Sequence, residues 1–355
     1  MANDSQRTAR DTVKAGRNRP DRPGGRTITR RHVLVGGAAL PATVLAACGR
    51  AEDSGTATAG GASPSGGARR IEGVQGRTYE LTGPPRRLYV SGGADLNDAL
   101  ALGVVPAVAE LFAGVELTAE QRAVDGIEDM AVIEITDGPN FEAIAAADPD
   151  FVLMQWADDA YQSRYAQIAP TMFVDSSRPW RDHLRDVAHA LFRDAEAELV
   201  IGDLELRFEE FRDRFAEREG QVPVVLHVSA DAAQLTLMTR ESGVGALLEE
   251  LGFAPIATSG DPYGESVSVE TIGTDAPGDF LIVAVDSWRY ADPDEPLPEP
   301  VAAVLDNPLV TGAPSAPGGP LLLPGDGNAL YYLDALTLPR FVDTLDDLLT
   351  GQAAR

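Results

Sequence analysis

The chain has 355 residues, a single cysteine and a net charge of −26, from 55 acidic and 29 basic side chains. So strong an acidic excess disfavours binding to nucleic acid or to anionic lipid head groups. A lone cysteine argues against an intramolecular disulfide, because it has no partner. The length predicts one to three domains.

The first 47 residues have the features of an export signal. Arg30 and Arg31 precede an apolar run from Val33 to Ala47. As a helix this run is roughly 22 Å long, too short to cross a hydrocarbon core of about 30 Å comfortably, and it suits the apolar region of a signal peptide. The arginine pair resembles the signal of the twin-arginine (Tat) pathway, which exports folded proteins.

Cys48 is expected to be the first residue of the mature protein. The sequence Leu45-Ala46-Ala47-Cys48 resembles the lipobox of bacterial lipoproteins, in which the thiol takes a diacylglycerol. Because two or more acyl chains hold a protein firmly, we expect a lipid anchor on the outer face of the cytoplasmic membrane. The alternative is a short membrane anchor with an incidental cysteine.

A flexible tether is expected over residues 48–76. Most of it, from Gly49 to Arg70, is rich in Gly, Ala, Ser and Thr and cannot bury enough apolar surface to order itself. Beyond residue 48 the chain holds 20 arginines and 52 acidic residues, a net charge of −32, which favours solubility.

From about residue 77 the sequence predicts an α/β fold. Continuous apolar runs of four to six residues, alternating with helices, favour parallel sheets covered on both faces. The expected strands are Arg87–Ser91, Val104–Ala109, Phe151–Met154, Thr171–Val174, Val222–Val228, Phe280–Val285 and Leu321–Leu323, and the expected helices are Asp95–Leu102, Glu142–Ala147, Val244–Leu251 and Leu338–Leu349.

One long amphipathic helix is predicted near the middle of the chain, over 194–220. One face is charged, and the other carries an apolar stripe made of Leu204, Phe208, Phe211 and Phe215. We therefore expect two Rossmann-like α/β lobes, at 77–193 and 221–355, joined by this helix, with the ligand cleft between the lobes.

Four segments in this order resemble a known family: Pro85–Ser91, Asp98–Pro106, Asn140–Val152 and Ile168–Thr171. They are similar to segments of the solute-binding proteins of ABC importers, in the helical-backbone group that handles ferric siderophores, haem and cobalamin. The resemblance runs from about residue 77 to 350. It implies a binding protein without enzymatic activity or a cofactor, which captures a ligand, most simply a ferric siderophore, and delivers it to a membrane permease.

The family also implies two docking acids, one on each lobe, which pair with arginines of the permease. They correspond to Glu142 and Glu270 in this chain, each at the start of an expected helix capped by Asn140 or Ser268. A separate subunit supplies ATP hydrolysis, and this chain has no Gly-x-x-x-x-Gly-Lys-Ser/Thr loop of its own. We expect the binding protein to be a monomer.

Aromatic and arginine side chains that follow predicted strands are the candidate ligand contacts, because α/β sheets bind ligands at the carboxyl ends of their strands. Guanidinium groups suit the oxygens of an iron chelate, and aromatic rings pack against its organic shell. The candidates are Trp156, Arg178, Trp180, Arg240, Tyr263, Trp288, Arg289 and Tyr290.

Other interpretations remain open. Haem or cobalamin could occupy the same fold, with Tyr263 or Tyr290 as an axial ligand of haem. A free-metal site is disfavoured, because His183 and His189 are six residues apart and His227 lies within a strand. A surface hydrolase lacks support from any nucleophile motif. A sensor lipoprotein that uses the two lobes without transport is the last alternative.

Overall fold

The computed structural model describes residues 67–351, apart from 137, 156–157, 176–177, 230–231, 273–276, 286–296, 317–318 and 324–332. The residues for which the lipidation of Cys48 and the export signal are predicted therefore lie outside the described part of the chain. Within the described residues, no helix is both long enough and apolar enough to cross a membrane.

The first α/β lobe, called the N-lobe here, runs from β1 to α5. Its strands are β1 (Arg69–Glu72), β2 (Thr78–Leu81), β3 (Leu88–Val90), β4 (Val108–Phe112), β5 (Ala131–Ile135), β6 (Phe151–Met154) and β7 (Thr171–Phe173). Its α-helices are α1 (Gly93–Ala101), α2 (Ala119–Arg122), α3 (Phe141–Ala146), α4 (Asp159–Ile168) and α5 (Trp180–Leu191), with 3-10 turns at Val74–Gly76 and Ile127–Asp129.

The second lobe, the C-lobe, runs from β8 to α11 and follows the long helix α6 (Asp194–Arg214) and a 3-10 turn at Ala216–Arg218. Its strands are β8 (Pro223–Val228), β9 (Leu235–Leu237), β10 (Glu265–Val267), β11 (Phe280–Val285) and β12 (Leu321–Leu323). Its helices are α7 (Gly243–Glu250), α9 (Glu299–Leu305), α10 (Pro308–Thr311) and α11 (Leu338–Thr350).

The two five-stranded sheets share one topology. The N-lobe order is β5-β4-β3-β6-β7, and the C-lobe order is β10-β9-β8-β11-β12, so the same relative order recurs. All pairs in the N-lobe sheet are parallel, whereas β9 pairs antiparallel with both β8 and β10. The expected α/β class with parallel strands is confirmed, and the antiparallel β9 is a departure from it.

Alternate residues of the central strands enter different cores, as strands covered on both faces require. In β11, Phe280, Ile282 and Ala284 pack in a large core that also includes residues of both sheets and of α6. Leu281, Val283 and Val285 pack in a second core on the opposite face of the C-lobe sheet. Both faces of β11 are therefore filled.

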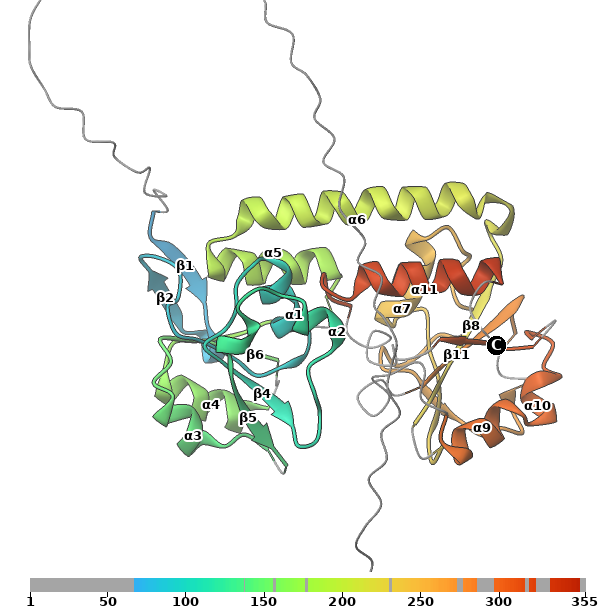
Figure 1. Cartoon of the computed structure of the whole chain (residues 1–355), viewed down its shortest axis with the longest axis horizontal. Coiled ribbons are helices and arrows are strands. Elements are labelled where there is room, and N and C mark those ends of the chain that lie inside the picture. The colour runs from blue at the N-terminus through green and yellow to red at the C-terminus, as the bar shows by residue number, and fades with distance from the viewer. Residues whose placement is uncertain are drawn as a thin grey trace, which may run out of the picture. The chain divides into compact units, whose positions relative to one another are not determined.

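Helix α6 runs beside α5 of the N-lobe and α11 of the C-lobe (Figure 1). The predicted stripe is buried: Leu204, Phe208 and Phe211 are at most 3% exposed, and Phe215, just after the helix, is 7% exposed. On the opposite side Leu206 is 60% exposed. The helix ends at Arg214 rather than at residue 220, because a 3-10 turn follows.

The end of the predicted tether is part of the fold. Strand β1 begins at Arg69 and pairs antiparallel with β2, so residues 69–76 are ordered against the N-lobe. Ile71 and Val74 are 1% and 4% exposed, and Arg69 pairs with Asp194 at the start of α6. Single apolar residues between glycines and charged residues gave no strand periodicity from which this hairpin could be predicted.

Candidate ligand-binding site at the strand ends

The two sheets each contain a point where the chain direction across the sheet reverses. From β3 the chain proceeds to β4 on one side, and from β6 to β7 on the other; β8 and β11 repeat this arrangement. Open α/β sheets bind ligands outside the carboxyl ends of the strands at such a point. The ends of β3, β6, β8 and β11 therefore define the candidate site.

The N-lobe part of this edge is closely packed around glycine. Gln155, the residue after β6, donates its backbone N–H to the Ser91 hydroxyl oxygen at 2.9 Å. Gly93, at the start of α1, has φ +61°, and a Cβ there would lie 1.9 Å from Oε1 of Gln155. Only glycine lets the Gln155 side chain approach the beginning of α1 this closely.

Four of the predicted ligand contacts lie outside the described residues. Trp156 directly follows Gln155, and Trp288, Arg289 and Tyr290 belong to the segment after β11. Their assignment stays a prediction. The topology supports the assignment, because the strands that precede these residues, β6 and β11, occupy equivalent places in the two sheets.

Trp180 is a core residue. It is 3% exposed, begins α5, and meets the ring of Phe208 edge-on at 6.0 Å between centroids. A side chain this enclosed has little surface to offer to a ligand. A position after a strand suggested a recognition surface, but the sequence does not say to which side the first residue of α5 points.

The described arginine candidates are held by the protein itself. Arg178 pairs with Asp182 at 3.7 Å and with Asp186, both on α5. Arg240 donates Nη2 to the Ala257 carbonyl oxygen at 3.1 Å. Each residue is exposed, and each guanidinium has a partner within the protein.

The antiparallel course of β9 changes the place of Arg240. Leu235 of β9 pairs with Val228, at the end of β8, and Leu237 pairs with Leu226. The chain after β9 thus returns to the edge at which β8 begins, and Arg240 lies there. The strand-end argument does not apply to this residue. Tyr263, by contrast, is 49% exposed in the loop before β10.

The two predicted docking acids are exposed at helix or turn starts. Glu142 lies in the first turn of α3, and the expected Asn140 cap is confirmed by its Oδ1 accepting from Ala143 N at 3.1 Å. Glu270 follows β10; its own backbone N–H and the Ser268 hydroxyl hold the pKa of this carboxyl below its usual value. Both carboxylates are available to a partner.

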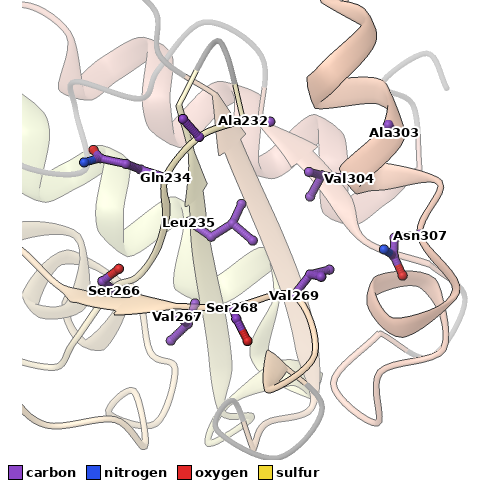
Figure 2. Close-up of a pocket in the computed structure, with 11 residues that line it drawn as sticks. Ala232, Gln234, Leu235, Ser266, Val267, Ser268, Val269, Ala303, Val304 and Asn307 are labelled. Atoms are coloured by element: carbon purple, nitrogen blue, oxygen red, sulfur yellow. The ribbon is translucent and has the colours of Figure 1, made fainter.

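Two of the pockets on the described surface are lined by no predicted ligand contact. One, of about 440 Å³, belongs to the C-lobe alone; Figure 2 shows Leu235, Val269 and Val304 around it, from β9, the chain after β10 and α9. The other, of about 390 Å³, follows α6 near Arg181 and Phe208. The residues lining the first pocket are Ala232, Ala233, Gln234, Leu235, Ser266, Val267, Ser268, Val269, Ala303, Val304 and Asn307.

A buried polar cluster on α1 escaped the sequence analysis. Asp95, Asn97 and Asp98 are at most 9% exposed, and His183 of α5 is 1% exposed between the two aspartates. Three polar residues within four positions of an otherwise apolar helix were a usable signal. In the part of the chain that the structure describes, no three His, Cys, Asp or Glu side chains are grouped so as to hold a metal ion.

The profile described as "Periplasmic binding protein" matches residues 93–314, from α1 to beyond α10. The chain belongs to the periplasmic binding protein family. This membership agrees with the two similar sheets and with α6 running beside helices of both lobes.

One similar protein is named for the ferric ligand that it binds. The ferric-anguibactin-binding protein FatB of Vibrio anguillarum is 24% identical over 224 residues, which make up 60% of this chain and 66% of FatB, just under two thirds of its length.

Solved structures share the fold. A periplasmic solute-binding protein from Mycobacterium smegmatis has a TM-score of 0.66 at 21% identity, over 81% of this chain and 99% of that one. The triscatecholate siderophore binding protein FeuA of Bacillus subtilis, complexed with ferri-bacillibactin, has a TM-score of 0.64 at 19% identity, over 81% and 100%.

Proposed function

We propose that this chain is the extracytoplasmic substrate-binding component of an ABC importer, and that it captures a ferric siderophore and delivers it to a membrane permease. Family membership and the resemblance to FatB support this function. The observation that carries it is topological: tryptophans follow the equivalent strands β6 and β11 at the switch points of the two sheets.

Ligand capture is assigned to the residues that follow β6 and β11 in the sequence: Trp156 after β6, and Trp288, Arg289 and Tyr290 after β11. Indole rings can pack against the organic shell of a chelate, and a guanidinium can donate to its oxygens. One such group of residues after each sheet's central strand would hold the ligand between the lobes. A lipid on Cys48 would keep the loaded protein near the permease.

Ligand binding is tested by tryptophan fluorescence of the Cys48→Ser chain, titrated with ferric hydroxamates, ferric catecholates, haem and cobalamin. We expect saturable quenching by one class of ferric siderophore. Trp156→Phe and Trp288→Phe should each remove much of the quenching, because their rings contact the ligand. Trp180→Phe is the matched control. The ligand should still quench the fluorescence of this variant, because Trp180 is buried against Phe208 and does not contact the ligand.

Binding of haem or cobalamin in place of any siderophore would keep the import role and overturn the iron-chelate assignment. If none of the four ligand classes changed the tryptophan fluorescence, the result would contradict the proposed function as a whole.

The docking role of Glu142 and Glu270 predicts a loss of uptake without a loss of binding. The double variant Glu142→Ala/Glu270→Ala should reduce cellular uptake of the radiolabelled ferric ligand by about tenfold or more, because each truncation leaves a permease arginine unpaired. The ligand Kd of the purified variant should be unchanged. A matched pair of exposed acids on α6, Glu210→Ala/Asp213→Ala, should leave uptake intact; equal loss in both pairs would contradict the docking assignment.

A further inference from the structure

A buried ionic cluster lies where α1 meets α5. The imidazole of His183 is placed between two carboxylates of α1: Nδ1 lies 2.8 Å from Oδ2 of Asp98, and Nε2 lies 3.1 Å from Oδ1 of Asp95. All three side chains are at most 1% exposed. Acids this enclosed are stable as carboxylates only when a cation accompanies them, so the geometry calls for an imidazolium.

The same cluster reaches the C-lobe chain just before α11. The other oxygen of Asp98, Oδ1, accepts from the backbone N–H of Ala335 at 2.7 Å. Beside it, Nδ2 of Asn97 donates to Oδ2 of Asp334 at 2.9 Å. Gln121 of α2 donates to the Asn97 oxygen at 2.8 Å and so fixes the orientation of that amide.

Asp334 connects this cluster to the start of α11. Its Oδ1 accepts from the backbone N–H of Thr337 at 2.8 Å and from the Thr337 hydroxyl at 2.9 Å. Thr337 directly precedes α11, and α11 packs on β12 of the C-lobe and on α6. Two series of hydrogen bonds, joined through the adjacent residues 97–98 and 334–335, therefore lead from the N-lobe to the start of a C-lobe helix.

The other charges nearby have partners of their own. Asp334 faces Asp98 and adds a third carboxylate to the cluster. From α2, Glu120 lies 3.3 Å from Arg340 of α11. On α5, Arg181 is held by Glu205 of α6 and Glu250 of α7 at 2.9 and 2.8 Å. Among the described residues, His183 is the cationic side chain that contacts both Asp95 and Asp98.

We propose that Asp95, Asn97, Asp98, His183 and Asp334 form an interlobe joint, in which the charge on His183 holds α1 in the position that keeps the Asp334–Ala335 chain attached to the N-lobe. Without the imidazolium, Asp95 and Asp98 repel each other across one turn of α1, and desolvation opposes both charges. The bonds from Asp98 to Ala335 and from Asn97 to Asp334 then lose their geometry. The joint limits how far the lobes can rotate relative to one another, whatever ligand they hold.

The proposal is tested by measuring interlobe distances in the full chain carrying Cys48→Ser. Spin labels are placed through Val132→Cys in β5 and Leu309→Cys in α10, which are 43% and 48% exposed. His183→Gln should broaden the distance distribution and add a second maximum. His189→Gln is the matched control, because it makes the same change on the same helix at a side chain that is 50% exposed and faces Asp194 at 3.3 Å; its distribution should equal that of the parent.

A charge-compensated variant separates loss of the joint from loss of folding. Asp95→Asn/His183→Gln removes one acid together with the cation, so it should fold and show a narrower distribution than His183→Gln alone. Asn97→Leu leaves the ionic cluster intact and removes the bonds of Asn97 to Asp334 and to Gln121, and it should also broaden the distribution. If folded His183→Gln and Asn97→Leu both keep the parent distribution, the joint does not set the lobe orientation and the proposal is overturned.

A spectroscopic signature reports on the cation directly. In the ¹⁵N spectrum of labelled histidine in the parent chain, both ring nitrogens of His183 should show the imidazolium pattern at pH 8. A neutral ring at that pH would overturn the charge-dependent part of the proposal.

Discussion

Phe208→Ala is expected to lower the free energy of unfolding by about 3–5 kcal/mol. Phe208 is 1% exposed in the middle of α6, and its ring meets Trp180 of α5 edge-on. It belongs to the large core that includes residues of both sheets, so the cavity would open where the two lobes share their packing. Because α5 and α11 also pack on α6, the surroundings cannot collapse freely into the space.

The measurement is urea unfolding followed by far-UV circular dichroism, with Leu206→Ala as the control. Leu206 lies two residues away on the same helix and is 60% exposed, so its truncation should change the free energy by about 0.5 kcal/mol or less. Equal effects at the two positions would mean that the α6 stripe is not the shared core of the lobes.

Local periodicity made much of the fold predictable. The strands predicted at Phe151–Met154 and Phe280–Val285 have these bounds in the structure, because an unbroken apolar run suits a strand whose two faces are both covered. The stripe on α6 was equally visible, since residues three and four apart share one face of a helix. Both the strands and the helix stripe could be predicted from a few residues that are close together in the sequence.

Contacts between distant residues were not predictable in this way. His183 meets an aspartate 85 residues earlier, and Asp98 bonds to a backbone group 237 residues later. No periodicity encodes such pairs; only the meeting of α1, α5 and the chain before α11 creates them. Polar residues in an apolar helix can indicate that a buried partner exists, but not which residue it is.

The direction of a strand and the direction of a side chain were the two features of the candidate site that could not be predicted from the sequence. The place of Arg240 followed only from the register of β8 and β9, which takes this residue to the opposite edge of the sheet. At the start of α5, the sequence position of Trp180 likewise did not predict that its side chain is buried. A residue's place after a strand locates its backbone near an edge, whereas packing decides whether its side chain faces the ligand or the core.

Stability should fall as the pH rises above neutrality, and His183 should account for a large part of the fall. Although burial opposes the charge on His183, hydrogen bonds and charge attraction from Asp95 and Asp98 raise its pKa from 6.5 to about 10. The folded protein therefore holds a proton that the unfolded chain releases above pH 6.5. The stabilisation is fully present below pH 6.5 and is lost as the pH passes about 10.

The shift corresponds to roughly 4–5 kcal/mol. Asp334 acts in the same direction at lower pH, because burial and the neighbouring Asp98 raise its pKa from 3.8 to about 7. Its contribution is present below pH 3.8 and is lost as the pH rises through about 7. The free energy of unfolding of the parent chain should thus decrease from pH 4 to 10 through these two groups.

The His183 part is isolated by subtracting the Asp95→Asn/His183→Gln variant, which retains Asp334 and lacks the buried carboxyl that would take up a proton once the cation is gone. The free energy of unfolding of the parent minus that of the variant should be largest at pH 6 and shrink steadily between pH 7 and 10, because only the parent loses a bound proton from position 183. Urea unfolding at pH 6, 8 and 10 measures it. A difference that stays constant over this range would mean that His183 is neutral in the folded protein, and that Asp95 and Asp98 are kept buried by protonation of a carboxyl group instead.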